Sequence, residues 1–122
     1  MALTKTPIEL SSTPGIVDNS NATAITIDSS ENVGIGISNP SDYYTNFNSL
    51  VLGNTSAASG MTIASGTTND GTLAFADGTS GTAEYSGYIQ YSHGTDSLSL
   101  GTAATERMRI DSSGNLLVGT TD

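Results

Sequence analysis

One ten-residue pattern occurs twice in the chain and constrains its fold more than any other feature. Residues 27–36 read Ile-Asp-Ser-Ser-Glu-Asn-Val-Gly-Ile-Gly, and residues 110–119 read Ile-Asp-Ser-Ser-Gly-Asn-Leu-Leu-Val-Gly. In both copies an alternating apolar run leads into a block of Asp, Ser and Asn, and a second alternating run follows. Alternation with a period of two places one set of side chains on one face of a sheet, and the polar block has the chemistry of a turn. Each copy therefore predicts a tight β-hairpin.

The two predicted turns differ at one position. Gly114 suits the left-handed position of a type I turn that is followed by a bulge. Glu31 occupies the same position in the first copy. We therefore expect Asn32 to take the positive φ there, or the first turn to be looser than the second.

The rest of the chain alternates in the same manner and predicts an all-β fold. Apolar residues alternate at 61–63, 73–75 and 98–100, and clusters rich in Asp, Gly and Ser separate these runs. Residues 49–53 predict a further short strand with Leu50 and Leu52 on one face. Turn residues at such short intervals, without helical periodicity, are typical of all-β modules. We expect turns at residues 70–71, 77–81 and 93–96, and a loop before the last hairpin. One longer strand should place Tyr85, Gly87, Ile89 and Tyr91 on one face and Glu84, Ser86, Tyr88 and Gln90 on the other.

The predicted organisation has four parts. Residues 1–20 form an extended N-terminal attachment arm, because Pro7 and Pro14 disfavour helix. Residues 21–40 form the first hairpin module, residues 41–59 a connector, and residues 60–122 a C-terminal β head or knob. Four apolar arm residues are candidates for binding a partner, with a frayed terminus as the alternative: Ile8, Leu10, Ile16 and Val17.

The chain carries few large apolar residues from which to build a core of its own. Ile, Leu, Val and Phe make up about one fifth of its 122 residues, whereas Gly, Ser and Thr are far more numerous. A single chain of this size hides only about two thirds of its unfolded surface. Cysteine is absent, so neither disulfides nor thiolate metal sites can reinforce the fold. We therefore expect an obligate homo-oligomer whose core lies between chains.

The charge balance excludes two classes of partner. The net charge is −9, and the only basic residues are Lys5, Arg107 and Arg109. Binding of nucleic acid depends on neutralising phosphates with Lys and Arg, so we expect neither nucleic acid nor an anionic membrane as a partner. The opening Met-Ala-Leu-Thr-Lys-Thr lacks the apolar segment of a signal peptide. We expect synthesis and assembly in the cytoplasm.

Three segments in this order resemble a known family. Phe75-Ala-Asp-Gly-Thr-Ser-Gly, Tyr85-Ser-Gly-Tyr-Ile-Gln-Tyr-Ser-His and Arg107-Met-Arg-Ile-Asp-Ser-Ser-Gly-Asn-Leu-Leu-Val-Gly are similar to fibre and appendage proteins of tailed bacteriophages, those of marine and cyanobacterial phages above all. Residues 7–10 and 24–36 resemble the same family. The similarity covers roughly residues 7–37 and 60–119.

The resemblance implies an intertwined homotrimer, a short fibre or knob of β-hairpins with strands from three chains wrapped about one axis. Many relatives continue into a C-terminal chaperone domain that cuts itself off, so the chain either trimerises unaided or is the fragment left after cleavage. The short length favours a non-enzymatic knob on the virion surface, as capsid decoration, cement protein or head fibre. Its partners would be the major capsid protein or another virion protein. A tail fibre or receptor-binding module that adheres to host surface glycans is the alternative.

The expected trimer core consists of the alternating apolar residues of the predicted strands. They are Ile25, Ile27, Val33, Ile35, Leu73, Phe75, Ile89, Tyr91, Leu98, Leu100, Met108, Ile110, Leu116 and Val118. Arg107 and Arg109 flank Met108, so they should point away from this face and pair with acidic residues of a neighbouring strand or chain. If the glycan alternative holds, the binding side chains would be Tyr43, Tyr44, Tyr88 and Tyr91.

Candidates for catalysis are sparse, and we expect neither an enzyme nor a cofactor. His93 is the only histidine, and a Ser-His-Asp arrangement would have to use it with Asp77 or Asp96. Glu84 with Asp77 would be the carboxylate pair of a glycan-cleaving tailspike fragment, although tailspikes are normally far longer chains. We expect no metal either.

Calcium is the one plausible ion. Its ligands would be the acidic residues that recur at the two repeated turns, Asp28, Glu31 and Asp111. Caps of the turns are the simpler interpretation of the same residues.

Overall fold

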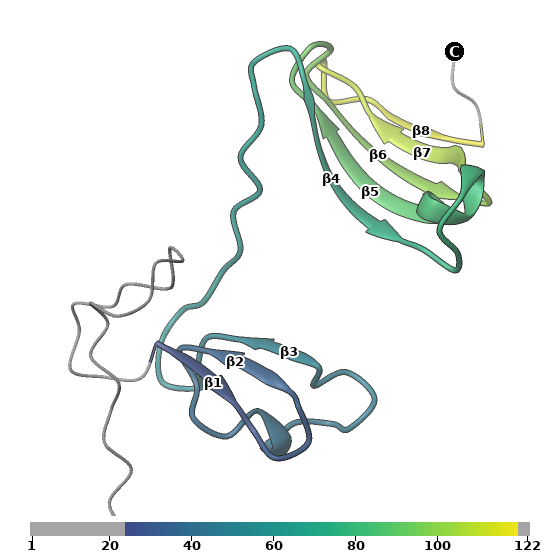
Figure 1. Ribbon diagram of the computed structural model, residues 1–122. Helices are drawn as coiled ribbons and strands as arrows, with labels where there is room; N and C mark the ends of the chain where they lie inside the picture. The colour runs from purple at the N-terminus through teal and green to yellow at the C-terminus, as the bar shows by residue number, and fades with distance from the viewer. Residues whose placement is uncertain (1–23, 120–122) are drawn as a thin grey trace, which may run out of the picture. The chain divides into compact units, whose positions relative to one another are not determined.

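The computed structural model describes residues 24–119 of the chain (Figure 1). The described chain separates into two compact units, residues 24–61 and residues 62–119, and each unit is considered by itself. Both units are built on β-sheets, and the described helices are short 3-10 turns. The prediction of an all-β chain is confirmed. No helix in this part of the chain is long and apolar enough to cross a membrane.

The first unit contains a three-stranded sheet in the order β1-β2-β3. Strands β1 (Ile25–Ile27) and β2 (Val33–Ile35) are antiparallel and form the first predicted hairpin. Strand β3 (Leu50–Leu52) pairs with β2 in parallel, after the short helix η2 (Pro40–Asp42). Part of the stretch predicted as a connector therefore belongs to this sheet.

One face of the first sheet is closed by the chain between β2 and β3. Val51 is 8% exposed and is the one buried aliphatic side chain among residues 24–119. Pro40 and Gly34 are buried with it. A Cβ at Gly34 would lie only 2.7 Å from the carbonyl oxygen of Ile37, so the returning chain approaches too closely for any larger residue. Glycine at this position lets the small core close.

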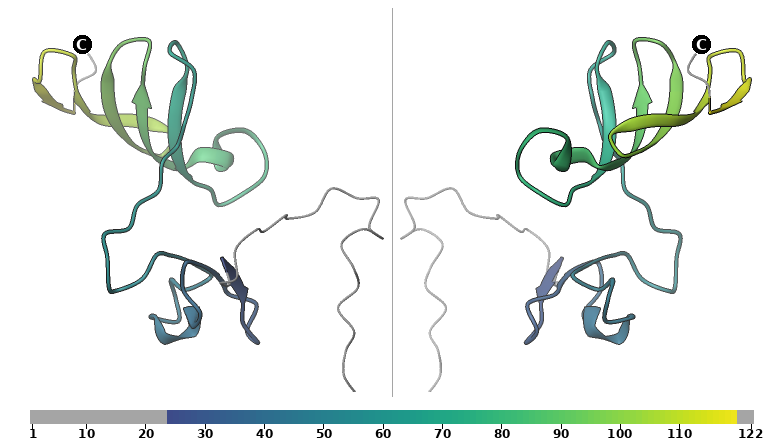
Figure 2. Two further views of the ribbon diagram at one scale, coloured as in Figure 1. Left: turned by 90° about the vertical axis from the view of Figure 1, so that its left-hand side faces the viewer. Right: turned by 90° about the vertical axis from the view of Figure 1, so that its right-hand side faces the viewer.

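The second unit is a single five-stranded antiparallel meander (Figures 1 and 2). The strands follow one another in chain order, so β4 and β8 form its two edges. The helix η3 (Gly81–Tyr85) connects the first two strands. The strands are β4 (Asp70–Phe75), β5 (Gly87–Ser92), β6 (Ser97–Thr102), β7 (Thr105–Ile110) and β8 (Leu116–Val118).

The two repeated hairpins have the same register. Ile25 pairs with Ile35 and Ile27 with Val33 in the first, while Met108 pairs with Val118 and Ile110 with Leu116 in the second. The alternation read from the sequence is thus confirmed in both. The first turn is not loosened by its glutamate, because Glu31 itself takes the left-handed conformation at φ 64°, as Gly114 does at φ 84°. The expectation that Asn32 takes the positive φ is wrong.

Three boundaries in the second unit differ from the sequence prediction. Asp70 and Gly71 begin β4 instead of turning, since the turn closes earlier through a hydrogen bond from Asn69 N to Gly66 O. The alternation at 61–63 forms no strand. Tyr85 belongs to η3, not to β5, and lies with Tyr88 in one pocket instead of sharing a face with Ile89.

The loop expected before the last hairpin is a two-residue turn. Ala103 and Ala104 both have positive φ, 51° and 54°, as in the type I′ turns that join right-twisted strands. Ala104 N also donates to Ser86 O at 3.1 Å. No Gly, Asn or Asp marks the turn, which explains why the sequence predicts only an irregular loop.

A β-bulge in β7 places Arg109 and Glu106 on the same face of the sheet. The register shifts between Leu100 and Gly101, so that Met108 pairs with Leu100 but Glu106 pairs with Gly101. Arg109 and Glu106 consequently share a face. In a regular strand, two residues three positions apart would lie on opposite faces. Arg109 Nε and Nη2 donate to Glu106 Oε1 and Oε2, each at 2.8 Å, and these bonds raise the pKa of the Arg109 guanidinium. The acidic partner of Arg109, expected on a neighbouring strand or chain, therefore lies in the same strand. Arg107 Nε instead donates to Thr102 Oγ1 on the neighbouring strand β6, at 3.3 Å.

Candidate functional site

The five-stranded sheet has one apolar face that no other helix or strand of its own unit covers. We call it the β4–β8 apolar face. The register aligns Leu73, Ile89, Leu100, Met108 and Val118 in one row across the strands. A second row contains Tyr91, Leu98, Ile110 and Leu116, and Phe75 extends the face at the end of β4.

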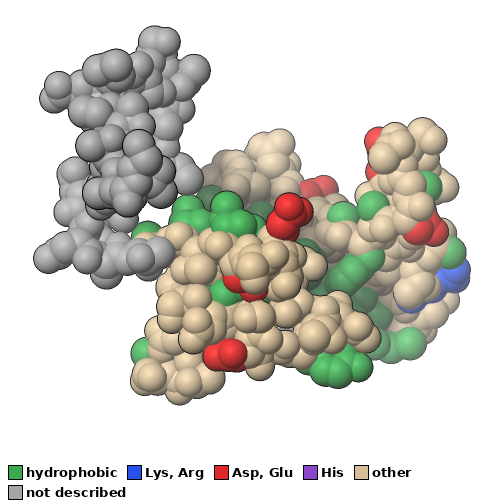
Figure 3. Space-filling model, turned by 60° about the horizontal axis from the view of Figure 1, so that its bottom comes forward, with side chains coloured by type: hydrophobic (Ala, Val, Ile, Leu, Met, Phe, Trp, Pro, Cys, Tyr) green, Lys and Arg blue, Asp and Glu red, His purple; other side chains and the backbone are tan. Residues whose placement is uncertain are grey.

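The side chains of this face are open to solvent in the single chain. Val118 is 64% exposed, Leu116 61% and Phe75 57%, and even Ile89 on the inner strand β5 is 41% exposed. Hydrophobic side chains reach the surface in the view of Figure 3. Contiguous exposed apolar area of this kind marks an interaction surface in soluble proteins.

The first sheet repeats the arrangement on a smaller scale. The face opposite Val51 carries Ile27 at 70% exposure, together with Ile25, Ile35, Leu50 and Leu52. The parallel pairing aligns Val33 with Leu50 and Ile35 with Leu52, so β3 enlarges this face. Leu50 and Leu52, predicted in a short strand but outside the expected trimer core, thus belong to an apolar face.

The structure thus distributes the predicted core residues over two apolar faces. Four of them lie on the exposed apolar face of the first sheet, and ten lie on the β4–β8 apolar face. The predicted partner-binding residues of the arm, Ile8, Leu10, Ile16 and Val17, lie outside the described residues.

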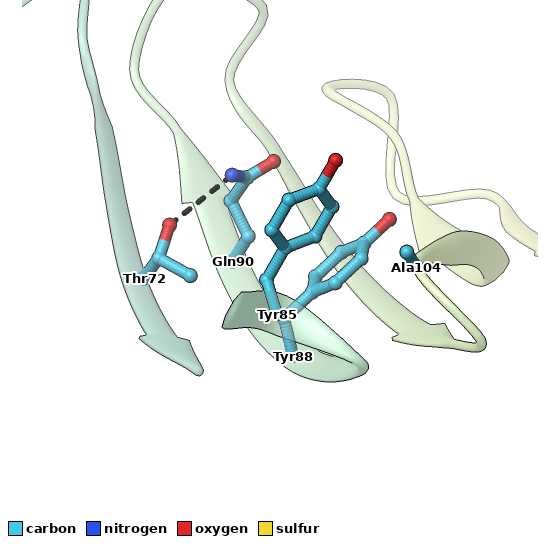
Figure 4. A pocket seen from close by; sticks show the side chains of 5 residues that line it. All are labelled: Thr72, Tyr85, Tyr88, Gln90 and Ala104. Atoms are coloured by element: carbon cyan, nitrogen blue, oxygen red, sulfur yellow. Dashed lines mark hydrogen bonds between the residues drawn. The ribbon is translucent and has the colours of Figure 1, made fainter. Parts of the chain in front are cut away.

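A pocket lies on the opposite, polar face of the five-stranded sheet. Its volume is about 270 Å³, and it is lined by Thr72, Tyr85, Tyr88, Gln90 and Ala104. Figure 4 shows the two tyrosine rings side by side, with both hydroxyls pointing the same way. Gln90 Nε2 donates to Thr72 Oγ1 at 3.1 Å, which leaves the Gln90 carbonyl oxygen free to accept (Figure 4).

The Tyr88 ring is held in place by a glycine on the next strand. A Cβ at Gly101 would overlap the Tyr88 ring, so the ring lies directly on the backbone of β6. Tyr88 packs against this backbone, while Tyr85 is 43% exposed. The pocket therefore combines aromatic rings with hydrogen-bonding groups.

The four tyrosines proposed for glycan binding do not form one surface. Tyr43 and Tyr44 belong to the first unit, where the centroids of the Tyr44 and Phe47 rings lie 5.3 Å apart. Tyr88 and Tyr91 lie on opposite faces of β5. Only Tyr88 lines the pocket, where Tyr85 joins it. Tyr85 was not predicted at this site, because the alternation in the sequence continues through η3 and predicts Tyr85 on the face of Ile89.

Tyr91 makes its own contacts on the apolar face. Its hydroxyl donates to Asp96, which raises the pKa of Tyr91, and its ring meets His93 edge-on with centroids 5.0 Å apart. Asp77, the other acid considered beside His93, accepts from Ser86 Oγ at 2.7 Å. These contacts tie the candidate catalytic residues into turns of the sheet.

The repeated turn carboxylates are used within their own turns. Asp111 Oδ1 accepts from Ser113 N and Asn115 N at 2.9 and 2.8 Å, and Oδ2 accepts from Asn115 Nδ2 at 2.8 Å. The bond to the Asn115 side chain is the main reason why the pKa of Asp111 is lowered. Within residues 24–119 no three His, Cys, Asp or Glu side chains gather as a metal site.

Asp28 makes the same set of bonds in the first turn. Its Oδ1 accepts from Ser30 N and Asn32 N at 2.8 and 3.0 Å, and Oδ2 accepts from Asn32 Nδ2 at 3.0 Å. The Asn32 side chain likewise lowers the pKa of Asp28. Two equivalent carboxylates thus act as caps of their turns, which is the simpler of the two interpretations considered for them.

Comparison with known proteins adds no relative. No protein-family model, no curated protein and no solved structure matches the chain.

Proposed function

We propose that this protein is a non-enzymatic structural module that assembles into a homotrimer through its apolar sheet faces. The observation that carries the proposal is the uncovered β4–β8 apolar face. A sheet with one apolar face must bury that face against another layer to be stable. Moving a large apolar side chain from full exposure to full burial contributes about 1.5–3 kcal/mol. Eight of the ten side chains of this face are 37–64% exposed in the single chain, so each gains part of that value on assembly.

Its place would be the surface of a bacteriophage particle, as capsid decoration, cement protein or head fibre, with the major capsid protein or another virion protein as its partner. The resemblance of residues 75–81, 85–93 and 107–119 to phage fibre and appendage proteins supports this assignment. The net charge of −9 supports it further, because many acidic copies on one particle repel each other and stay dispersed.

Light scattering on the full chain tests the assembly. We expect a mass of three times 12.4 kDa. Ile89→Glu places a charge on the apolar face and should shift the mass toward that of one chain. Gln90→Glu, one residue along β5 on the polar face, is the matched control and should leave the trimer intact. A folded wild-type monomer would overturn the proposal.

Antibody labelling of virions tests the location. Gold particles over the head would support capsid decoration or a head fibre, and gold confined to the tail would support a tail fibre. An unlabelled virion, with the protein present only in the lysate, would contradict a structural role in the particle.

The pocket at Tyr85 and Tyr88 favours a second function, adhesion to host surface glycans. A flat sugar ring would lie against a tyrosine ring, and its hydroxyls would bond Gln90 Oε1 and Thr72 Oγ1. Binding to a glycan array tests this function. Tyr85→Ala should abolish the signal, whereas Tyr44→Ala in the first unit should not change it. Equal binding by both variants and the wild type would exclude the pocket.

A further inference from the structure

The two edges of the five-stranded sheet are complementary to each other. The hydrogen bonds of the β7–β8 hairpin show which backbone groups of β8 bond no other strand among the described residues. Asp111 N donates to Asn115 O and Gly119 N to Arg107 O, so residues 115, 117 and 119 point toward β7. The N–H and C=O groups of Leu116 and Val118 therefore point outward. Both side chains lie on the β4–β8 apolar face.

The same assignment can be made for β4. His93 N donates to Asn69 O, so Asn69, Gly71, Leu73 and Phe75 bond toward β5. Asp70, Thr72 and Ala74 present their N–H and C=O groups outward. The side chains of Thr72 and Ala74 lie on the polar face. The outward-bonding residues are thus apolar-face residues on β8 and polar-face residues on β4.

The first unit shows which strand such an edge accepts. Its hairpin has the same register as that of β7 and β8, and its outward-bonding residues are Val33 and Ile35. Val33 N donates to Ser49 O, and Gly53 N donates to Ile35 O. The partner strand β3 is parallel to β2. The residues through which β3 bonds to β2 carry their side chains on the opposite face of the sheet from Val33 and Ile35. The outward-bonding residues of β8 and β4 also carry their side chains on opposite faces, so these two edges match in the same way.

We propose that β8 of one copy pairs in parallel with β4 of the next copy, so that the five-stranded sheets join head to tail around the trimer. This inference rests on the proposed trimer. Four successive antiparallel pairings give β4 and β8 the same direction within one copy. Rotation about an axis along the strands preserves that direction, so a cyclic assembly brings the two edges together in parallel.

Parallel pairing is also the arrangement that keeps the apolar face continuous across the interface. In a parallel ladder, the backbone of Leu116 bonds to two outward-bonding residues of β4, for example Thr72 and Ala74. Its side chain then lies beside that of the residue between them, Leu73 in this example, on the apolar face. An antiparallel ladder would instead set Leu116 directly opposite Thr72 or Ala74 and would continue the apolar face of one copy into the polar face of the next. Both open edges would be satisfied at once, as solubility requires.

Engineered cysteines test the pairing in the full chain, which contains no cysteine of its own. Thr72→Cys combined with Leu117→Cys places two cysteines on the polar face of adjacent strands from two chains, and the backbones of such strands lie about 5 Å apart. Within one chain they are separated by four strand spacings, about 19 Å, which is too far for a disulfide. We expect covalent trimers on a non-reducing gel. Ala74→Cys with Leu117→Cys tests the register shifted by two residues.

Two controls make the result specific. Leu73→Cys with Leu117→Cys places the thiols on opposite faces and should give no cross-link. Leu117→Cys alone should also remain uncross-linked, and a covalent dimer from it would overturn the proposal in favour of β8 pairing with β8. A trimer mass in light scattering without a cross-link in either register would overturn this pairing and leave the trimer standing. A monomer mass would overturn both.

Discussion

The two repeated hairpins are the same structure built from different residues. Residues 24–36 and 107–119 share every backbone hydrogen bond of the turn: Asp28 N to Asn32 O at 3.1 Å corresponds to Asp111 N to Asn115 O at 3.1 Å. Gly36 N to Ala24 O corresponds to Gly119 N to Arg107 O. The turns differ at the left-handed position, where Glu31 stands in one and Gly114 in the other. The geometry of the turn therefore comes from the Asp and Asn side chains, since it survives a change from glycine to glutamate.

The hairpins also differ in what lies beside them. Strand β3 occupies the outer edge of β2, while the equivalent edge of β8 has no strand beside it among the described residues. Identical local structure thus has two different tertiary roles. In one unit the edge is closed by the same chain, and in the other we propose that a second copy closes it.

The largest expected effect comes from removing the turn carboxylates. Asp111→Ala deletes three hydrogen bonds to Ser113 and Asn115 and should lower the melting temperature by several degrees. Asp28→Ala should affect its own unit to a similar extent. Amide hydrogen exchange separates the two units, since each variant should expose the amides of its own turn only. Loss of protection in both turns from a single variant would contradict this expectation and would show that the two turns unfold together.

Removing the left-handed glycine comes next in magnitude. Gly114 has φ 84°, and a side chain at that position costs about 1–2 kcal/mol, so Gly114→Ala should destabilise the second hairpin by that amount. The reciprocal change, Glu31→Gly, relieves the same strain in the first hairpin. Its gain should stay below about 1 kcal/mol, because glycine loses more backbone entropy on folding. Chemical denaturation of each variant measures the difference, and a stabilising Gly114→Ala would contradict the left-handed turn.

The sequence predicts these hairpins well and other connections poorly, and the reason is local chemistry. Asp, Ser and Asn at fixed spacing form the turn through their own side chains, so the pattern contains the structure. Ala103 and Ala104 carry no such chemistry, and the tight turn there is imposed by the pairing of β6 with β7. Likewise η3 diverts Tyr85 to the polar face because the chain must pass from β4 to β5, which alternation alone does not encode.

The candidate surfaces divide in the same way. Alternation predicts every residue of the β4–β8 apolar face, because the facing of a strand residue depends on its parity alone. The pocket and the Arg109–Glu106 pair depend on a turn and a bulge, each of which shifts that parity by tertiary contacts. The parallel partner of β2 was equally hidden, since it requires a return of the chain through residues 36–49.

The Ala103–Ala104 turn provides a third hairpin against which to compare the two repeats. Replacing it with the preferred type I′ pair, Ala103→Asn with Ala104→Gly, should stabilise the second unit by up to about 1 kcal/mol. Thermal unfolding measures the gain. The same replacement made as Gly-then-Asn is a suitable control of composition. A loss of stability from Asn-Gly would show that the turn is not of type I′.

The smallest expected effect is the pH dependence of the two carboxylates. The pKa values of Asp28 and Asp111 are lowered in the folded chain, chiefly by the side chains of Asn32 and Asn115. A lowered pKa means that the carboxylate stabilises the fold above its unfolded pKa of about 3.9, and that this contribution is lost as the pH falls through the folded pKa. The difference in melting temperature between wild type and Asp111→Asn should therefore be full at pH 7 and should narrow below about pH 4. The difference between wild type and Asp28→Asn should narrow over the same pH range, since Asp28 and Asp111 accept the same hydrogen bonds. A difference in melting temperature that stays constant down to pH 3 would show that the negative charge of Asp111 does not contribute to the stability of the turn.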